Sequence, residues 1–416
     1  MMGTMSGSAL QQQTVSSQEQ RRILFLTTRF PYPPDRGDRL HAYQLIRAFA
    51  ARFDVTVVAF QGGGEDGRGK TAIEDLGVRV RTVPLSRSAS TWRLARGLLD
   101  GDPLQVAYYA EPRIYRLLER ISAESAPFDA VVCHLIRTAP WVEHVRARRR
   151  LISLADSLSL SLTRRLRFAP MLERPSIYLE QARVRRFEKQ VMAHFDEGWV
   201  VSEVDRSEYP GGFERIRAIP AGADEELLAG GLPDETDPVV GFLGHLSVPH
   251  NVDAAAILIE KIQPRLSAMG IPAKIRLIGG DPAPRIARLL AGPAVEWLGF
   301  VPNLASELRR VRVFCAPLRY SAGVQSKLVD ALAAGVPVVT SPEAAQGLGP
   351  GAERWVWIAD SVDEYARAIA KAWQPSPERS RRLEGARQWV RERFRWGAYA
   401  DRLQDLVTSD SSGEAD

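Results

Sequence analysis

Short apolar runs alternate with amphipathic segments along most of the chain. The first run, at 23–28 (ILFLTT), is apolar throughout, which is typical of a strand buried on both faces of a parallel sheet. A helix with Leu45, Ile46 and Phe49 on one side follows it. Further strands are predicted at 55–60, 78–83, 130–133, 151–154 and 198–201. Repeated alternation of strand and helix predicts a doubly wound parallel sheet.

The same pattern begins again at 239–243 (VVGFL). A helix is predicted at 252–269, with strands at 275–278, 295–298, 313–316, 336–340 and 355–358. We therefore predict an α/β protein with two Rossmann-like domains, which face each other across a central cleft lined by the carboxyl ends of both sheets.

The boundaries of these parts follow from composition. The N-terminal domain is predicted at 21–217 and the C-terminal domain at 238–380, with a linker rich in Gly, Pro and acidic residues at 218–237. One long helix is expected at about 380–406, so that segment 381–408 crosses back to the N-terminal domain with Trp396 and Tyr399 as anchors. Residues 1–20 and 409–416 are expected to be disordered tails.

The length of 416 residues also favours two domains. Cys133 and Cys315 each lie in an apolar strand, so we expect buried free thiols and a reducing cytoplasm. No apolar run approaches the roughly 20 residues that a membrane-spanning helix needs. The first 20 residues lack the apolar core of a secretory signal. A cytoplasmic location is therefore predicted.

Positive charge is concentrated in the first half. Residues 21–220 carry 33 Lys and Arg against 24 Asp and Glu, with clusters at 146–150, 164–167 and 183–186. A basic face would suit membrane headgroups at the inner surface of the plasma membrane, nucleic acid or an anionic acceptor. Nucleic acid is the least favoured partner, because no helix-turn-helix, zinc or aromatic-stacking motif accompanies the charge. Arginines that only decorate solvated helices would give the same pattern.

Segment 314–340 (FCAPLRYSAGVQSKLVDALAAGVPVVT) combines a strand, a loop at Gly323 and a helix. A glycine loop before a helix presents backbone N–H groups and a positive dipole end to a phosphate. Lys327 adds a cation in the first turn, and Arg319 offers a forked donor. Asp330 lies about one turn further on, where a carboxylate can bind sugar or ribose hydroxyls. Ordinary α/β connectivity would also account for the glycines.

Four segments together resemble the GT-B glycosyltransferases, specifically the retaining enzymes of family 4 and a branch associated with bacterial exopolysaccharide gene clusters. The likeness covers roughly residues 22–408. The four segments are RFPYPPDRGDRLHAYQLIRAFA, FEKQVMAHFDEGWVVSEVD, GFLGHLSVPHNVDAA and GVQSKLVDALAAGVPVV.

This resemblance implies a nucleoside-diphosphate sugar bound mainly by the C-terminal domain, and a glycan, lipid-linked or small-molecule acceptor bound mainly by the N-terminal domain. No metal or other cofactor is expected, because side chains and a helix end can supply the positive charge. The implied catalytic residues are His134, Lys327 and Asp330. The implied donor contacts are Gly244, His245, Gly299, Val301, Arg319, Gly323, Val324 and Gln325, and the implied acceptor contacts are Gly37 and Asp156.

Several of these residues also fit purely structural roles. His134 fits a structural histidine, Gly37 fits a turn glycine, and Asp156 fits a helix N-cap. Two departures from the family pattern also matter. The Glu-x7-Glu motif reads Ala322 and Asp330 here, and His245 and His250 stand where stronger cations are usual. A sugar-nucleotide epimerase or hydrolase, and a GT-B scaffold that has lost catalysis, are the alternative functions.

Overall fold

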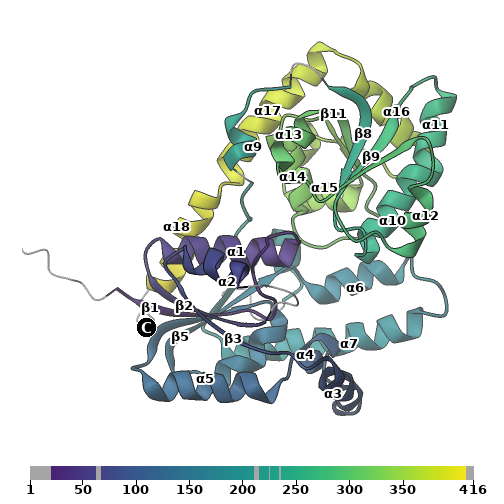
Figure 1. Cartoon of the computed structure of the whole chain (residues 1–416). Coiled ribbons are helices and arrows are strands. Elements are labelled where there is room, and N and C mark those ends of the chain that lie inside the picture. Colours follow the sequence, from purple (N-terminus) through teal and green to yellow (C-terminus); the bar gives the residue numbers. More distant parts are fainter. Residues whose placement is uncertain (1–19, 62–66, 210–214, 224, 234–235, 409–416) are drawn as a thin grey trace, which may run out of the picture.

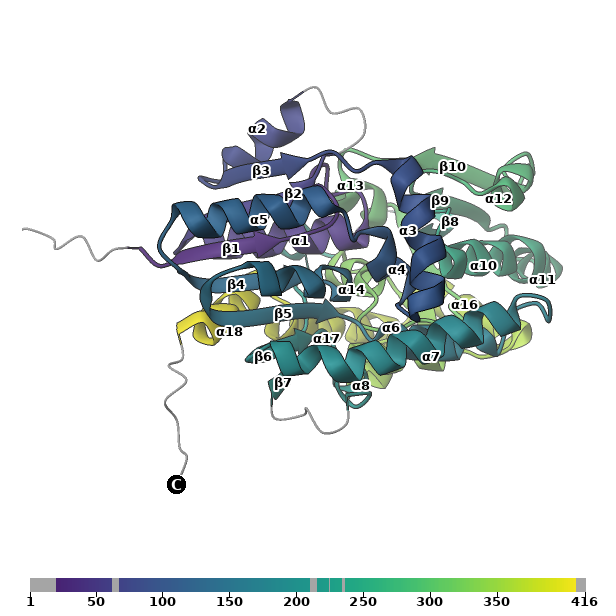
Figure 2. The same ribbon diagram turned by 90° about the horizontal axis from the view of Figure 1, so that it is seen from below.

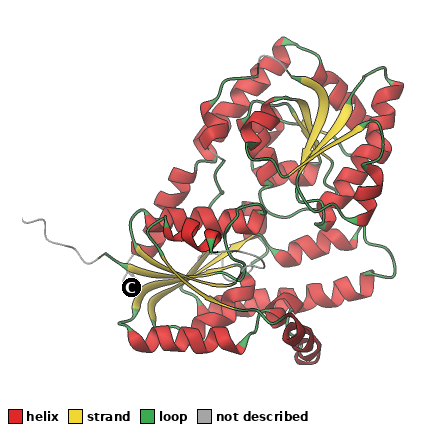
Figure 3. Cartoon of the chain, in the orientation of Figure 1, coloured by secondary structure: helices red, strands yellow, loops and turns green. Residues whose placement is uncertain are grey.

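The computed structural model describes residues 20–61, 67–209, 215–223, 225–233 and 236–408. It forms two α/β domains, one above the other in Figure 1, and each has a parallel sheet enclosed by helices (Figure 3). The predicted α/β architecture, with two doubly wound parallel sheets, is confirmed. Two apolar clusters cover opposite faces of the N-terminal sheet, and a third forms the core of the C-terminal domain.

The N-terminal sheet has seven strands in the described residues, in the order β3-β2-β1-β4-β5-β6-β7, and all neighbours are parallel. Their bounds are β1 Arg22–Leu26, β2 Asp54–Phe60, β3 Arg79–Val83, β4 Phe128–His134, β5 Ala147–Ala155, β6 Glu197–Val200 and β7 Ile216–Ala218. Each of the predicted strands is present, and β7 is additional. The sequence of β7, Ile-Arg-Ala, contains no apolar run.

The C-terminal sheet has six parallel strands in the described part of the chain, in the order β10-β9-β8-β11-β12-β13. Their bounds are β8 Asp237–Leu243, β9 Lys274–Ile278, β10 Val295–Gly299, β11 Val311–Ala316, β12 Val338–Thr340 and β13 Trp357–Ile358. These strands overlap the predicted ones.

The helices lie on both faces of each sheet (Figures 1 and 2). Those of the N-terminal half are α1 Gly37–Ala50, α2 Arg68–Glu74, α3 Arg87–Asp100, α4 Leu104–Tyr108, α5 Pro112–Glu124, α6 Leu158–Leu166, α7 Arg174–Val191 and α8 Glu203–Arg206, with 3-10 turns η1 Ile136–His144 and η2 Met192–His194. Those of the C-terminal half are α9 Glu225–Ala229, α10 Pro249–Ile257, α11 Gln263–Ala268, α12 Pro284–Leu289, α13 Leu304–Arg309, α14 Ser326–Ala333, α15 Pro342–Leu348, α16 Val362–Trp373, α17 Pro377–Arg393 and α18 Trp396–Thr408.

Two predicted helices are interrupted. The helix expected at 252–269 contains a π-helical segment, η4 (Leu258–Ile262), between α10 and α11. Pro264 follows this segment, and a proline has no N–H to continue the α-helical bonding. The single helix expected at about 380–406 is two helices, because α17 ends at Arg393 and α18 begins at Trp396.

The break between α17 and α18 has a visible cause. Segment 222–223 passes directly against it: the Ala223 N–H donates to the Phe394 carbonyl over 2.8 Å, and a Cβ on Gly222 would lie 2.3 Å from the backbone nitrogen of Trp396. Phe394 is buried in the C-terminal core, whereas Tyr399 of α18 is buried in a core cluster of the N-terminal domain. The chain therefore crosses between the domains twice at one place.

The segment expected to be a linker is partly core. Ile219 is buried with the N-terminal domain, while Ala223 and Leu227 are buried with the C-terminal domain. A short helix, α9, lies inside this segment. The chain therefore anchors itself in both domains within a few residues of the crossing.

Each sheet changes winding direction at its centre, between β1 and β4 and between β8 and β11. Loops after these strands diverge and leave a crevice, where ligands of open α/β sheets bind. Three non-glycine residues in the described chain have positive φ: Leu135 (68°), Ala155 (58°) and Asp281 (51°). Each one lies at or just beyond the carboxyl end of a strand. Such backbone strain gathers at functional sites.

Both cysteines are buried and free, as predicted, and burial raises the pKa of both thiols, to about 12 for Cys133. None of the helices in the described residues has the length and apolar character to span a membrane.

Candidate active site

Three glycines line the carboxyl ends of β8, β9 and β10. The Gly279 N–H donates to the Gly299 carbonyl over 2.8 Å. A Cβ on Gly279 would lie 2.1 Å from the carbonyl oxygen of Gly244, and Gly279 has a φ of 135°. Only glycine fits this close approach of backbones. The sequence predicted a role for Gly244, Gly299 and the adjacent Val301 but missed Gly279, which the Gly-Gly pair after the strand at 275–278 could have indicated.

Lys327 lies in the first turn of α14, but it is buried instead of being the mobile cation expected. Its ammonium donates to the Asn251 side-chain oxygen and lies 5.0 Å from the centre of the Phe242 ring. Burial lowers the pKa of Lys327 to about 7, because the charged form is poorly hydrated there. Asn251 also donates to the His245 carbonyl over 3.1 Å. It therefore joins Lys327 to the loop after β8, a role that sequence reasoning missed.

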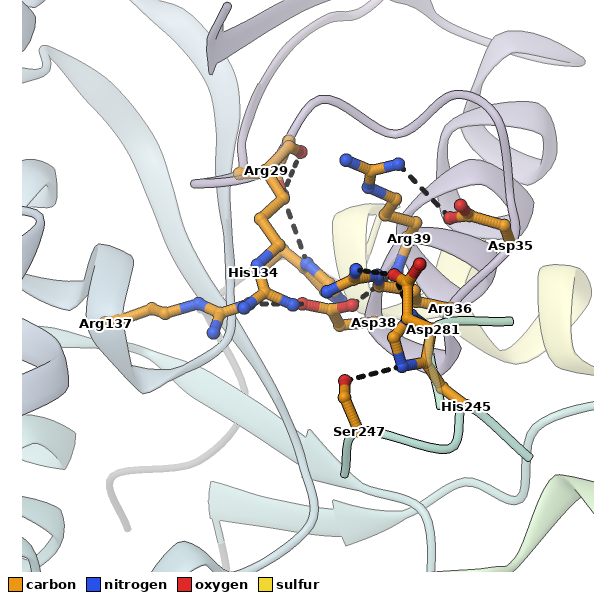
Figure 4. Close-up of polar contacts among 11 residues, drawn as sticks. Arg29, Asp35, Arg36, Asp38, Arg39, His134, Arg137, His245, Ser247 and Asp281 are labelled. Atoms are coloured by element: carbon orange, nitrogen blue, oxygen red, sulfur yellow. Dashed lines mark hydrogen bonds and ion pairs between the residues drawn. The ribbon is translucent and has the colours of Figure 1, made fainter. Parts of the chain in front are cut away.

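His245 lies where the loop after β8 meets the N-terminal domain (Figure 4). Its Nε2 is 3.0 Å from the Asp281 carboxylate, and its Nδ1 is 2.9 Å from the Ser247 hydroxyl. Asp281 also accepts from Arg36 of the N-terminal domain over 3.0 Å. His250 is different, because burial and the nearby Lys327 lower its pKa to about 3 and keep it neutral. His250 therefore does not replace the cation that is usual at its position.

Arg319 is engaged by protein groups. It forms a two-pronged ion pair with Asp253, and its guanidinium carbon lies 4.8 Å from the centre of the Phe168 ring. Phe168 belongs to the turn between α6 and α7, so this contact joins the two domains. Arg319 would have to leave Asp253 to reach a phosphate, and the structure does not bring it to Lys327.

The loop before α14 packs against the N-terminal domain. Gly323 has a φ of 69°, and a Cβ there would lie 3.0 Å from the Asp156 Cβ. The Gln325 amide donates to the Ala322 carbonyl over 2.8 Å, so Gln325 stabilises the loop. Val324 is partly buried at the domain boundary, and Asp330 is partly buried on α14.

Asp205 of the N-terminal domain holds this loop directly. Its Oδ1 accepts the Gly323 N–H over 3.2 Å and the Ser157 N–H over 2.9 Å. Arg164 adds a bond of 2.5 Å to the Ser321 carbonyl. Asp156 adjoins them and is exposed to water at its outer side, while the protein around its carboxyl group and the nearby Asp205 raise its pKa to about 7. The expected acceptor residue Asp156 therefore lies beside the loop expected to bind the donor.

An ionic cluster forms the facing wall (Figure 4). Gly37 begins α1. The next residue, Asp38, forms ion pairs with Arg29 at 3.0 Å and with Arg137 at 2.6 Å. Although burial opposes ionisation, Arg137 and Arg29 hold the pKa of Asp38 below its ordinary value. The sequence did not single out these three residues, because their contact joins the β1–α1 loop to η1 far along the chain.

His134 is at the carboxyl end of β4, as predicted, but its ring is 1% exposed. Its Nε2 is 3.3 Å from His41 Nδ1, and its Nδ1 is 3.4 Å from the Thr27 hydroxyl. His41 Nε2 is 2.8 Å from the Tyr399 hydroxyl, which is 2.9 Å from Trp199 Nε1. The chain of contacts therefore runs from α18 to the end of β1.

The Trp199 indole at one end of this chain of contacts determines which atom donates in each hydrogen bond. An indole N–H can only donate, so the Tyr399 oxygen accepts from Trp199 and its own proton goes to His41 Nε2. His41 Nδ1 then donates to His134 Nε2, and His134 Nδ1 donates to Thr27. Burial lowers the pKa of His41 to about 4 and that of His134 well below its ordinary value, so both rings are neutral. We call Trp199, Tyr399, His41, His134 and Thr27 the histidine relay.

Within the described residues, no group of three or more His, Cys, Asp or Glu side chains is arranged to hold a metal ion. The positive groups of the cleft are instead Lys327, His245 when protonated, and the arginines of the ionic cluster.

Two family models match the chain. Residues 37–222 match a glycosyl transferase 4-like domain, and residues 237–374 match the glycosyl transferases group 1. A comparison with curated protein sequences gives no significant match.

Several solved structures share the fold over nearly the whole chain. Alr3699/HepE of Anabaena, solved with UDP, has a TM-score of 0.67 and 17% identity, and the match covers 94% of this chain and 100% of that one. Sucrose-phosphate synthase of Thermosynechococcus elongatus gives 0.64 and 18%, covering 93% and 98%. WaaG, a glycosyltransferase involved in lipopolysaccharide biosynthesis, gives 0.65 and 15%, covering 93% and 100%. The chain is thus a GT-B protein that joins a glycosyl transferase 4-like domain to a glycosyl transferases group 1 domain.

Proposed function

We propose that this protein is a retaining glycosyltransferase that moves a sugar from a nucleoside diphosphate to an acceptor hydroxyl, in bacterial polysaccharide or glycoconjugate biosynthesis. The observation that supports it most is the meeting of two strand-end walls at the switch points of both sheets. One wall combines close-packed glycine backbone with the buried Lys327, and the other combines the Asp38 cluster with the buried His134. A crevice between two such walls suits two substrates that must meet.

The glycine wall suits the nucleotide. Several backbone groups of the three glycines are used within the wall: the Gly244 N–H donates to the Ile278 carbonyl, the Gly279 N–H donates to the Gly299 carbonyl, and the Gly279 carbonyl accepts from Trp297 Nε1. In this proposal the glycines contribute room for the nucleotide at the strand ends, because they carry no side chains of their own. Asn251 links Lys327 to this wall, because it accepts from the Lys327 ammonium and donates to the His245 carbonyl. In this proposal the diphosphate lies between the glycine floor and the start of α14, and Asp330 and Val301 contribute further along the nucleotide.

The chemistry requires positive charge at the departing group. As the bond from the anomeric carbon to the diphosphate breaks, negative charge grows on the diphosphate, and a cation there stabilises the transition state more than the ground state. An approaching diphosphate also raises the pKa of Lys327 and completes its protonation. This mechanism needs no metal ion, and the acceptor hydroxyl approaches from the side of Asp156 and Gly37.

The experiment is a panel of UDP-, GDP-, dTDP- and ADP-sugars, scored by thermal shift and by released nucleotide. HepE was solved with UDP and with UDP-glucose, so UDP-glucose is the first donor to test. Nucleotide release that depends on an added acceptor supports the proposal. Release without transfer would indicate a hydrolase, and binding without release would indicate a scaffold that has lost catalysis.

A further inference from the structure

Large apolar side chains protrude from one part of the N-terminal domain. Of the twelve large hydrophobic residues exposed in the described chain, eight lie between 92 and 179. The most exposed are Leu172 (96%), Leu99 (88%) and Met171 (81%). We define the apolar ridge as Trp92, Leu98 and Leu99 of α3, Met171 and Leu172 of the α6–α7 turn, and Tyr178 and Leu179 of α7.

Backbone contacts hold the parts of the ridge together. Arg183 of α7 donates to the Leu98 carbonyl over 3.0 Å, and Arg186 donates to the Gly101 carbonyl over 2.8 Å. Glu180 accepts the Leu104 N–H over 2.8 Å. Leu179 lies one turn before Arg183, so it shares a surface with the end of α3. Figure 2 shows α3 and α7 on the face turned toward the viewer.

The charge around the ridge is positive. Residues 164–189 carry eight Arg and Lys against three Glu. Two of those glutamates are used internally, because Glu188 is 3% exposed and accepts backbone N–H groups while Glu180 holds α4. The exposed cations of this segment are Arg167, Arg174, Arg185, Arg186 and Lys189.

The other arginine-rich cluster differs. Arg148 pairs with Asp129 and Arg149 pairs with Glu197, while Arg146 donates to the Ser122 and Ser125 carbonyls. Those arginines stabilise the ends of β4, β5 and β6. Exposed positive charge therefore lies beside the protruding apolar side chains at α7, whereas the arginines at 146–149 are engaged by neighbouring protein groups.

We propose that the apolar ridge docks this protein on an anionic lipid bilayer. Apolar side chains that stand out from a turn and from helix surfaces can enter the boundary between headgroups and acyl chains, while neighbouring arginines bind the phosphates. Each of the two signals alone gives weak, reversible binding, and both are present here. The surrounding charge complements an anionic surface and gives an acidic-lipid bilayer the advantage over a protein partner.

The ridge adjoins the candidate active site. Phe168, in the same turn as Met171 and Leu172, stacks on Tyr320 of the C-terminal domain with ring centres 6.2 Å apart. A bilayer on the ridge would therefore lie beside the domain boundary and present a lipid-linked acceptor there. This consequence rests on the proposed function, whereas the docking itself does not.

The test is flotation of the full chain with vesicles of phosphatidylcholine alone or mixed with phosphatidylglycerol, at low and high salt. Wild type is expected to float with the anionic vesicles only, and high salt is expected to weaken binding about tenfold. The variant Leu99→Ser, Met171→Ser, Leu172→Ser is expected to lose about tenfold in binding, and so is Arg167→Gln, Arg185→Gln, Lys189→Gln.

The matched control removes exposed apolar side chains from the C-terminal domain. Met269 (42%) and Ile358 (44%) are exposed there, and Met269→Ser, Ile358→Ser should float like wild type. Failure of wild type to float at low salt would overturn the proposal, as would equal binding by the ridge variant. Concentration-dependent self-association that the ridge variant loses, without vesicle binding, would assign the ridge to a second copy and also overturn it.

Nucleotide release by the same preparations separates the two proposals. The ridge variant should release nucleotide from a nucleotide sugar in solution at the wild-type rate. Absence of nucleotide release from every preparation, while wild type still floats with anionic vesicles, would contradict the proposed function and leave the docking standing.

Discussion

The two walls of the cleft are built on different principles. The C-terminal wall is mostly backbone: three glycines meet at its floor, and its one central cation among the described residues, Lys327, is buried against a neutral amide. The N-terminal wall is made of side chains, with two arginines on Asp38 and a relay of buried histidines. A backbone wall recognises an extended ligand by shape, whereas a side-chain wall positions polar groups individually.

This contrast predicts that a single substitution at Lys327 has the largest effect of any in the site. Lys327→Met should lower kcat/KM for the donor about a hundredfold, because loss of a charge-assisted contact to the diphosphate costs on the order of 3 kcal/mol. The fold should persist and become more stable at pH 7, since a buried amine is removed. Circular dichroism and thermal melting check the fold, and released nucleotide checks activity.

The control for this change is Lys371→Met, which removes an exposed lysine on α16 that pairs with Glu378. It should leave kcat/KM unchanged. If Lys327→Met keeps more than about a tenth of wild-type kcat/KM, Lys327 is not the phosphate cation. The C-terminal wall would then lack the charge that this comparison assigns to it.

The second prediction uses pH. The pKa of Lys327 in the folded protein is about 7, below its ordinary value of 10.5, so the ammonium is present below pH 7 and is lost as the pH rises through 7. We expect kcat/KM for the donor to fall about tenfold per unit above pH 7, because this ratio reports the free enzyme. Lys327→Arg should flatten the profile, since arginine stays protonated.

Asp156 has a pKa near the same value and must be separated from Lys327. The profile of Asp156→Asn should keep the fall above pH 7 if Lys327 causes it. If the fall above pH 7 disappears in Asp156→Asn but remains in Lys327→Arg, the titrating group is Asp156 of the N-terminal wall and not Lys327.

The contrast between the walls also accounts for what the sequence could predict. The alternation of strands and helices predicted both sheets, and the glycine loop with Lys327 was visible because its residues are close together in the chain. The burial of Lys327 was not visible, because its partner Asn251 is 76 positions away. The Asp38 cluster and the relay were also missed, since they join residues from distant parts of the chain.

The third prediction tests the relay. Tyr399→Phe removes the proton donated to His41 Nε2 and allows both histidines to adopt the opposite tautomers. We expect about a fivefold loss of kcat with little change in KM, as for one displaced hydrogen bond of about 1 kcal/mol. Nitrogen-15 spectra of labelled histidine report the tautomers directly.

A structural role alone would lower stability without changing the tautomers. Tyr365→Phe is the matched control, because Tyr365 is buried in the C-terminal core away from any histidine. Unchanged tautomers of His41 and His134 in Tyr399→Phe would refute the relay as the determinant of the ring states.

The smallest expected effect concerns the ion pair between Arg36 and Asp281, which joins the two walls. Both side chains are substantially exposed (34% and 67%), and exposed ion pairs contribute about 0.2–1 kcal/mol. Arg36→Gln should therefore change the donor KM by no more than about fivefold, and the difference should vanish at high salt because ions screen exposed charges. A tenfold or salt-independent effect would mean that Arg36 binds the diphosphate itself. The N-terminal wall would then share the donor site, and the division of the cleft into a backbone wall for the donor and a side-chain wall for the acceptor would fail at this residue.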